Sequence, residues 1–543
     1  MLGLMQDRPL QISQMIEFAA NYYPDVEIVA RTVEGPIHRY GYRDARKRAK
    51  QIAEALQGLG IKLGDRVGTL AWNTHRHFEL YFGISGIGAV LHTINPRLAP
   101  EHVAYIANHA EDQAIFVDLN LLPIVEGVWE HLKTVKHVVV MTDRAHMPQS
   151  KKIPKLLCYE ELIAANPGTL RWPDFDENTA SSLCYTSGTT GNPKGVLYSH
   201  RSTMIHAMMS SNGAVIPMNP DTTVLPVVPM FHANAWGLVY AAPICGAELV
   251  FPGPKLDGAS VYELLDKEKV TLSAGVPTVW LALLDYCAQN KFKMSTVKRT
   301  LIGGSAVPIS MIERFWKEHG IEVVQGWGMT EMSPLGTTTR FNRGERDLPD
   351  AERFAITAKA GRPVFGCEMK IIDDAGNDLP QDGSVSGNLV VRGPWIVKGY
   401  MKGDGKNQFL KDDWFMTGDV CKIETDGSVV ITDRSKDVIK SGGEWISSID
   451  LENAAMGCPG VAEAAVIGVK HPKWDERPLM IVVRRPDAKV AKEDILKFLD
   501  GKIAKWWMPD DVQFIDAIPH GATGKILKTA LRETFKDYKL PTA

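Results

Sequence analysis

The chain has 543 residues, of which 45% are hydrophobic and 23% are charged, and this composition excludes a disordered, collagen-like or coiled-coil protein. At roughly 150 residues per domain, the length allows three or four folding units. The 61 Lys and Arg residues are balanced by 64 Asp and Glu residues, so a net charge of -3 leaves no basic excess for holding a polyanion. We therefore expect no nucleic-acid partner.

The cysteines and the apolar stretches bear on location. Seven scattered cysteines without metal-ligand spacing predict reduced thiols of a cytoplasmic protein. Asp7 and Arg8 stand where a signal peptide would need an apolar core. Residues 222–247 lack Asp, Glu, Lys and Arg but contain three prolines, and we interpret them as buried strands and turns. No membrane span is expected.

The predicted elements alternate between helix and strand over the first two thirds of the chain. Residues 43–57 repeat apolar side chains at three- and four-residue steps, which predicts a helix with one buried face. Short strand-like runs follow (RVGTLAWN, AIFVDL, HVVVMTD, LCYTSG), and a second series lies between about 248 and 328 (ELVFP, VTLSAGVPTVW, RTLIGG, IEVVQGWG). This alternation predicts two α/β layers with largely parallel strands.

After about residue 360 the pattern changes to Gly-rich alternating segments, which predict a small antiparallel β subdomain. A strand EAAVIGV, a helix near 492–504 and a strand near VQFIDAIP then form a small α+β unit. The predicted fold class is α/β, with a large N-terminal domain at 1–433 and a small, mobile α+β C-terminal domain at 434–543.

The segment YTSGTTGNPKGV, residues 185–196, is the most informative one. Its hydroxyls, glycines and single lysine supply the donors and the positive charge that a polyphosphate needs, although a plain surface turn is the alternative. The pattern GxxxxGK[ST] is absent, so the usual nucleotide-binding P-loop is not implied. The predicted phosphate-binding residues are Thr186, Ser187, Gly188, Thr189, Thr190, Gly191 and Lys194.

This twelve-residue string resembles the signature of the adenylate-forming superfamily, which contains acyl-CoA synthetases, luciferases and peptide-synthetase adenylation domains. Further motifs of the superfamily follow in the same order up to about residue 528. GWGMTE resembles the motif in which an aromatic ring stacks on adenine, Thr reaches phosphate and Glu binds magnesium. The resemblance assigns these roles to Trp327, Thr330 and Glu331, and the hard Mg²⁺ ion prefers such a carboxylate. Gly304, Ser305, Ala306, Gly326 and Gly328 are expected beside the adenine.

Two further motifs imply ribose contacts and a hinge. WFMTGD resembles the element whose Asp holds both ribose hydroxyls, here Asp419. DRSKDVIKSGGEW resembles the hinge motif, in which Arg434 contacts ribose and Lys436 is the pivot. The same resemblance places the thiolation tunnel for coenzyme A at Lys440, Ser441, Gly442, Gly443, Glu444 and Trp445.

The remaining motifs imply the catalytic lysine and the acyl pocket. PHGATGKILK resembles the C-terminal motif whose lysine, here Lys525, stabilises the charge that develops when carboxylate attacks phosphate. MFHANAWG resembles the acyl-pocket segment, where His232 flanks the carboxylate and Trp236 gates the tunnel. Thr186, Glu331, His232 and Lys525 form the predicted catalytic set. The other predicted pocket residues are Ala233, Asn234, Gly237, Val276, Pro277, Gly303, Met329 and Pro334.

These resemblances predict an AMP-forming acyl-CoA synthetase that uses ATP, Mg²⁺ and coenzyme A to activate a carboxylic acid. The strings SGGEW and FHANAW resemble those of medium- to long-chain fatty acyl-CoA synthetases and also of methylmercaptopropionate-CoA ligases, so chain length stays open. Three alternatives are a carrier-dependent adenylation module, a luciferase-like oxygenase and a non-catalytic nucleotide-binding scaffold. Some relatives dimerise, which makes a homodimer possible.

Overall fold

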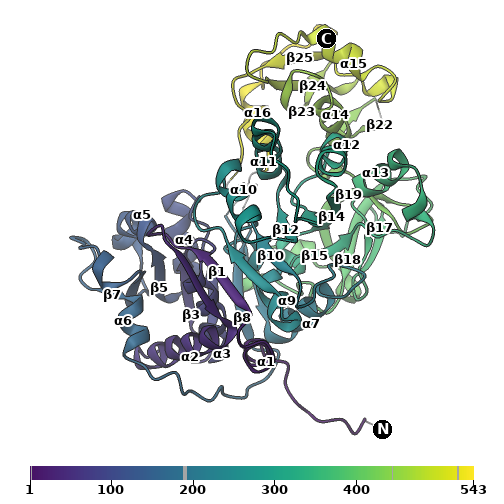
Figure 1. Cartoon of the computed structure of the whole chain (residues 1–543). Helices are drawn as coiled ribbons and strands as arrows, with labels where there is room; N and C mark the ends of the chain where they lie inside the picture. The colour runs from purple at the N-terminus through teal and green to yellow at the C-terminus, as the bar shows by residue number, and fades with distance from the viewer. Residues whose placement is uncertain (2, 187–191, 443, 522–524) are drawn as a thin grey trace.

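The computed structural model describes residues 1, 3–186, 192–442, 444–521 and 525–543. The two α/β layers occupy the N-terminal part, and the small β-sheet and the C-terminal domain follow beside and above the second layer (Figure 1). The predicted α/β class with a large N-terminal and a small C-terminal domain is confirmed, whereas the boundary at 433/434 stays a prediction.

The first layer is built on a seven-stranded sheet with the order β7-β6-β5-β3-β4-β8-β9. All of its neighbouring strands are parallel except the last pair, β8 and β9. The strands are β3 (Arg66–Leu70), β4 (Val90–Thr93), β5 (Asp112–Asp118), β6 (His137–Met141), β7 (Leu156–Cys158), β8 (Ala180–Tyr185) and β9 (Gly195–Ser199). The antiparallel β8–β9 pair at this sheet edge brings together Thr186 and Lys194, the two described ends of the predicted phosphate segment.

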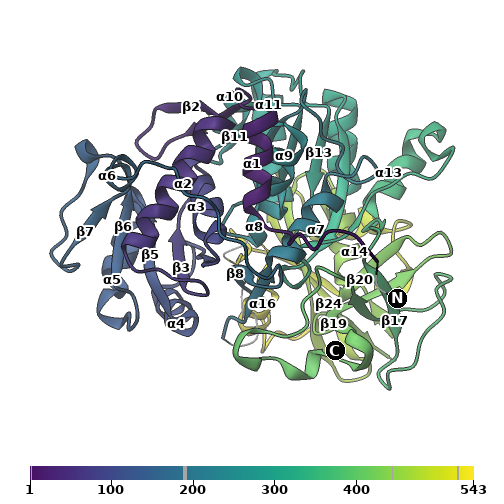
Figure 2. The same cartoon turned by 90° about the horizontal axis from the view of Figure 1, so that it is seen from below.

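Helix α2 (Tyr42–Gly58) confirms the predicted amphipathic helix and extends one residue beyond it at each end. Its apolar face is fully buried, and α3 (His75–Gly86) packs beside it (Figure 2). A Cβ on Gly83 would lie 2.2 Å from Ile52 Cγ2, so glycine is needed for this close approach. The remaining helices of this layer are α4 (Pro100–Ala110), α5 (Leu122–Val128) and α6 (Tyr159–Ala164).

The second layer is a nine-stranded sheet with the order β16-β15-β14-β13-β12-β10-β11-β1-β2. Its central strands β14 to β1 are parallel, and β1 and β2 come from the beginning of the chain. The strands are β1 (Glu27–Arg31), β2 (Ile37–Gly41), β10 (Thr223–Pro226), β11 (Glu248–Phe251), β12 (Leu272–Gly275), β13 (Arg299–Ile302), β14 (Glu322–Gly328), β15 (Leu335–Thr338) and β16 (Arg362–Pro363). Because the carboxyl ends of parallel strands share one edge, the predicted motifs after β10, β13 and β14 converge there.

Apart from α8 and α9, which are described below, six helices lie around this second sheet. They are α1 (Ser13–Tyr22), α7 (His200–Ser210), α10 (Gly258–Lys267), α11 (Pro277–Asn290), α12 (Ile309–Arg314) and α13 (Asp350–Ala358).

The apolar stretch 222–247 corrects one expectation. It is mostly buried, as expected, but only β10 is a strand. The segment α8 (Ala233–Trp236) is a left-handed turn, and α9 (Leu238–Cys245) is a helix. A short run that is apolar on all sides carries neither a two-residue nor a 3.6-residue period, so its sequence does not distinguish strand from buried helix. Among the described residues, no helix is long and apolar enough to cross a bilayer.

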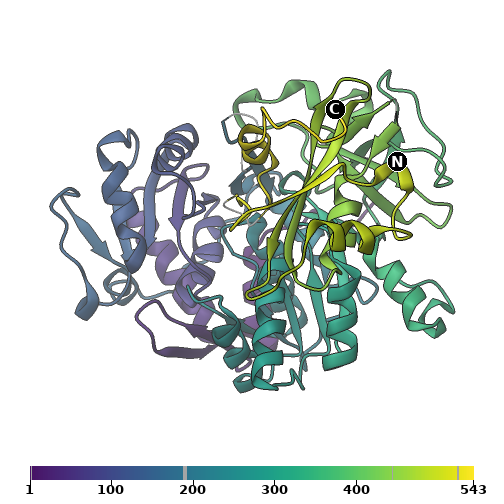
Figure 3. The same ribbon diagram turned by 90° about the horizontal axis from the view of Figure 1, so that it is seen from above.

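The small β subdomain is an antiparallel sheet of four strands: β17 (Glu368–Ile372), β18 (Gly387–Arg392), β19 (Phe415–Ile423) and β20 (Val429–Arg434). The C-terminal domain contains β21 (Ile439–Ser441), β22 (Glu444–Ile446), β23 (Val461–His471), β24 (Asp475–Arg484) and β25 (Asp511–Phe514), with α14 (Ser448–Met456), α15 (Lys492–Leu499) and α16 (Lys528–Thr534). Seen from above, this domain lies over the second layer and the small sheet (Figure 3).

The predicted helix near 492–504 is shorter than expected. It ends at Leu499, and the next residues, Asp500 and Gly501, are extended and left-handed respectively. A left-handed glycine is a common way to end a helix.

Candidate active site

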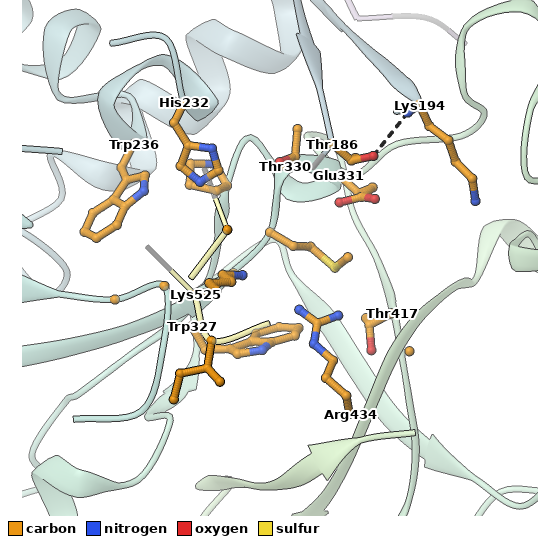
Figure 4. Close-up of a pocket in the computed structure, with 18 of the residues that line it drawn as sticks. Thr186, Lys194, His232, Trp236, Trp327, Thr330, Glu331, Thr417, Arg434 and Lys525 are labelled. Carbon is orange, nitrogen blue, oxygen red and sulfur yellow. Dashed lines mark hydrogen bonds between the residues drawn. The ribbon is translucent and has the colours of Figure 1, made fainter. Parts of the chain in front are cut away.

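A cavity of about 970 Å³ lies where the two layers, the small sheet and the C-terminal domain meet. Side chains from all four parts point into it (Figure 4). The predicted residues that line it are Thr186, Lys194, His232, Trp236, Gly303, Gly304, Gly326, Trp327, Gly328, Met329, Thr330, Glu331, Pro334, Arg434, Lys436 and Lys525. Residues separated by more than 300 positions in the sequence thus form one site.

The two ends of the predicted phosphate loop are tied together. The Thr186 amide donates to Lys194 O at 2.9 Å, and the Lys194 amide donates to Thr186 Oγ1 at 3.2 Å. These bonds continue the β8–β9 pairing, so both residues face the cavity (Figure 4). Ser187, Gly188, Thr189, Thr190 and Gly191 lie outside the described residues.

The GWGMTE segment forms the end of β14 and the short turn η5 (Thr330–Met332). A Cβ on Gly328 would lie 1.8 Å from Pro334 O, so no other residue fits this turn. Tyr198 donates its hydroxyl hydrogen to Thr330 O at 2.6 Å, and Tyr400 donates to Glu331 Oε1 at 2.6 Å. Two tyrosines from other elements therefore fix the turn that carries the predicted phosphate and metal ligands.

Asp419, Trp327 and Arg434 form a connected group beside the cavity. The Trp327 indole donates to Asp419 Oδ2 at 3.0 Å, and Arg434 Nε lies 2.8 Å from Asp419 Oδ1. Asp419 is buried and lies behind the cavity wall, while Trp327 and Arg434 line it. The carboxylate thus holds the ring and the guanidinium in place in this structure, and its predicted contact with ribose stays a prediction.

Lys525 enters the cavity from the C-terminal domain. The side chain lines the cavity and keeps an exposed surface. Partial desolvation of the ammonium in the cavity, together with the positive charge of Arg434, lowers its pKa to about 8. Desolvation and the charge of Lys525 lower the pKa of His232 to about 4. At neutral pH the site therefore combines a neutral imidazole with a lysine ammonium group.

Trp236 lines the cavity from the turn that follows β10. The ring leans on the end of β13, since a Cβ on Gly303 would lie 3.3 Å from Trp236 Cη2. The turn that carries the ring is left-handed from Ala233 to Trp236, with φ between 44° and 54°, a conformation that costs about 1–2 kcal/mol per residue. Asn234 anchors the turn by donating to Ser182 Oγ at 2.9 Å.

Several residues predicted for the adenine and acyl subsites do not line the cavity. Asn234 points toward β8 and accepts a hydrogen bond from Tyr81 at 3.3 Å. Val276 lies next to Gly304, because a Cβ on this glycine would lie 3.3 Å from Val276 Cγ1. The others in this group are Ala233, Gly237, Pro277, Ser305 and Ala306.

The predicted thiolation strip is also away from the cavity. It forms the β21–β22 hairpin of the C-terminal domain, and neither Lys440, Ser441, Gly442 nor Trp445 lines the cavity. Gly442 has φ of +60°, and a Cβ there would lie 3.0 Å from Trp474 Cε3. Gly443 lies outside the described residues, and of Glu444 only the strand position is described.

Sequence reasoning missed a group of cavity residues from connecting segments. Arg97 precedes α4, His102 lies in its first turn, and Ser210 ends α7. Tyr400 and Gln408 come from the segment between β18 and β19. No chemical motif marks these residues. The only signal was the polar and aromatic character of loops that follow strand ends, where binding residues concentrate.

Comparison with known proteins places this site in a family. The model of the AMP-binding enzyme family matches residues 16–401, and that of the AMP-binding enzyme C-terminal domain matches residues 450–525. The chain therefore belongs to the AMP-binding enzyme family. The sequence-based recognition of the adenylate-forming superfamily is confirmed.

The chain is 50% identical over 537 residues to a 3-methylmercaptopropionyl-CoA ligase of Ruegeria lacuscaerulensis, covering 99% of both chains. It is 45% identical over 540 residues to a medium-chain-fatty-acid–CoA ligase of Ectopseudomonas oleovorans, covering 99% of this chain and 98% of the relative. Among solved structures, an anthranilate CoA ligase in complex with anthranoyl-AMP superimposes with a TM-score of 0.86 at 26% identity, over 98% of this chain and 99% of that one. The predicted enzyme class, an AMP-forming acyl-CoA synthetase, is confirmed.

Proposed function

We propose that this protein joins a carboxylic acid with an uncharged aliphatic chain to coenzyme A in two half-reactions at the one cavity. The acid and ATP first give an acyl-adenylate and pyrophosphate, and the thiol of coenzyme A then gives the thioester and AMP. The observation that carries the proposal is the convergence of Lys525, Glu331 and Trp327 on a single cavity from different parts of the chain.

In the first half-reaction, a carboxylate oxygen bonds to the α-phosphorus while the bond from that phosphorus to the pyrophosphate oxygen breaks. Two anions must approach, so positive charge near the reacting atoms lowers the barrier. Lys525 supplies that charge, and Lys194 and Thr186 hold the leaving phosphates. His232, which is neutral because its pKa is about 4, can approach the acid without adding charge.

Glu331 is the proposed ligand for Mg²⁺. Its carboxylate lines the cavity beside Thr330, and oxygen ligands of this kind suit a hard divalent cation that also contacts phosphate oxygens. When bound, Mg²⁺ neutralises phosphate charge that the protein's own lysines leave uncompensated. Trp327 and Arg434 then provide a flat surface and a donor for the nucleoside, both held by Asp419.

In the second half-reaction, the thiol sulfur bonds to the acyl carbon, the bond from that carbon to the AMP oxygen breaks, and the thiol proton leaves to solvent. The predicted tunnel residues lie away from the cavity, so we propose that the C-terminal domain rotates about Lys436 between the two steps. The rotation withdraws Lys525 and brings Gly442 and its neighbours to the site.

The acid is a fatty acid or 3-methylmercaptopropionate. Both alternatives have support from relatives, at 45% and 50% identity. The contact between Trp236 and Gly303 favours the short acids, because the ring lines the cavity and takes up space that a longer chain would need. The names of the relatives speak against a carrier-dependent module, a luciferase-like oxygenase and a scaffold. A homodimer and a cytoplasmic location stay predictions.

The test is release of pyrophosphate and AMP from MgATP, with and without coenzyme A, across acids from propionate and 3-methylmercaptopropionate to octanoate and palmitate. We expect turnover that depends on coenzyme A and peaks among the short acids, and a broader acid profile for Trp236→Ala. Turnover with amino acids but with none of the other acids would contradict the proposal, and so would release of AMP without any thioester. An unchanged acid profile for Trp236→Ala would remove this ring from the pocket.

A further inference from the structure

The segment 393–408, which is the first part of the connection between β18 and β19, packs against the turn that carries Glu331. The Val397 amide donates to Glu331 O at 2.8 Å, and the Trp395 indole donates to Leu335 O at 2.8 Å. These bonds fix the backbone of the segment on both sides of the turn. The segment then continues across the cavity wall, where Tyr400 and Gln408 line the cavity.

The hydroxyl of Tyr400 orients the Glu331 carboxylate. Tyr400 is 5% exposed and Glu331 7% exposed, and the O–H donates to Glu331 Oε1 at 2.6 Å. An ordinary phenol is protonated at neutral pH, so the Tyr400 hydroxyl is the donor in this bond. A carboxylate has about four lone-pair positions, so this one bond sets its direction and leaves positions for a cation.

The ring of Tyr400 holds a second functional group. Lys194 Nζ lies 4.9 Å from the ring centroid and donates to Gln408 Oε1 at 2.7 Å. Gly405 borders both groups: its φ is +59°, and a Cβ there would lie 2.9 Å from Lys194 Nζ and 2.9 Å from Tyr400 Cε2. The lysine ammonium is thus placed by a ring face, an amide oxygen and a bare backbone.

We propose that Tyr400 is a positioning residue that sets the metal-binding carboxylate with its hydroxyl and the phosphate-binding ammonium with its ring. Glu331 follows β14 of the second sheet, and Lys194 precedes β9 of the first sheet. The two groups therefore share no helix or strand. One side chain fixes both and thereby couples binding of the cation to binding of the triphosphate. This inference rests on the proposed function, which assigns Mg²⁺ to Glu331 and phosphate to Lys194.

The test separates the two contacts of Tyr400. Binding of Mn²⁺ is followed by electron paramagnetic resonance in the presence of α,β-methylene-ATP, and binding of the analogue without metal is followed by calorimetry. Tyr400→Phe removes only the hydroxyl, and we expect Mn²⁺ affinity to fall about 10- to 100-fold, as for other groups that orient a metal ligand. Its affinity for the metal-free analogue should stay at the wild-type value. Tyr400→Leu also removes the ring and should weaken both.

Lys194→Met provides the opposite change, because it removes the ammonium group and leaves the Tyr400 hydroxyl bonded to Glu331. It should weaken binding of the metal-free analogue while Glu331 remains oriented. Tyr159→Phe is the matched control: Tyr159 is also buried and donates to a buried carboxylate, Glu79 Oε2, at 2.8 Å, but it does not line the cavity. It should leave Mn²⁺ affinity unchanged.

Two results would overturn the inference without touching the proposed metal site. One is wild-type Mn²⁺ affinity in Tyr400→Phe when Glu331→Gln has lost it, which would leave the proposed metal site intact. The other is an equal loss in Tyr400→Phe and Tyr159→Phe, which would mean a general effect of losing a buried hydrogen bond. If Glu331→Gln bound Mn²⁺ as well as the wild type, the proposed metal site itself would fall, and the inference with it.

Discussion

Two parts of the C-terminal domain are assigned to the same cavity, yet the structure brings only one of them there. Lys525 lines the cavity, whereas the β21–β22 hairpin with Gly442 packs beside Trp474 and Trp506 away from it. A single placement of this domain can therefore support the adenylate-forming step but not the proposed thioester-forming step. We therefore predict that the two steps need different placements of this domain, because Lys525 and the hairpin do not line the cavity together.

The largest expected effect separates the two steps at Lys525. Lys525→Ala should lower adenylate formation by about 10²–10³-fold, the usual cost of losing one donor that stabilises transition-state charge, while ATP still binds. Thioester formation from chemically prepared acyl-adenylate should change only a few-fold. Pyrophosphate release and thioester formation measure the two rates. Lys536→Ala, which removes an exposed lysine paired with Glu533, is the control; equal losses in both steps would contradict the separation.

The pH dependence of the first step follows from the lowered pKa of Lys525, about 8. The protonated ammonium is the active form, so adenylate formation should fall about tenfold per pH unit above that value. A pH profile of pyrophosphate release checks this, and Lys525→Arg, whose guanidinium stays charged, should abolish the fall. The folded chain loses this proton at a lower pH than the unfolded chain, whose lysine pKa is about 10.4. Lys525 should therefore make the free energy of unfolding rise with pH between about 8 and about 10.4. A profile that stays flat above pH 9 would contradict the assignment.

A smaller effect is expected from Gly442→Ala, at the part of the domain that is away from the cavity. The new Cβ would lie 3.0 Å from Trp474, at a φ of +60° that disfavours any side chain. We expect thioester formation to fall about tenfold with adenylate formation nearly unchanged, since the close approach of the pantetheine arm needs a bare backbone. Single-turnover measurement of each half-reaction tests it. If Gly442→Ala slowed adenylate formation instead, Gly442 would act in the domain placement observed in this structure.

The smallest effect concerns the contact between the domains. Asp285 of α11 pairs with Arg314 at 2.8 Å and with Arg485 of the C-terminal domain at 3.5 Å. Exposed pairs contribute about 0.2–1 kcal/mol, so Asp285→Asn should shift the ratio of the two half-reaction rates by less than about fivefold, in favour of thioester formation. Glu161→Gln, which breaks the exposed pair with Arg144 outside this contact, should leave the ratio unchanged. A shift toward adenylate formation would mean that the pair stabilises another placement.

The sequence predicted the elements with a clear period and the residues within strong motifs. The helix at 42–58 and the parallel strands follow from periodicity, and Trp327, Glu331 and Lys525 follow from motif resemblance. Residues 222–247 were expected to form strands and turns, and the helix α9 within them was missed because a mostly apolar run has no clear period. Asn234 was expected in the pocket, but its side chain is buried against β8.

The sequence by itself determined the class of enzyme, because the motifs that contain Lys525 and Glu331 keep a few residue types at fixed positions along the chain. Only the tertiary structure decided what orients them. Tyr400 belongs to a connecting segment without a motif, and its contacts with Glu331 and Lys194 arise from the packing of two sheets and a loop. Hydrogen bonds and ring contacts between distant segments depend on distances that the chain acquires only when it folds, and sequence spacing does not encode them.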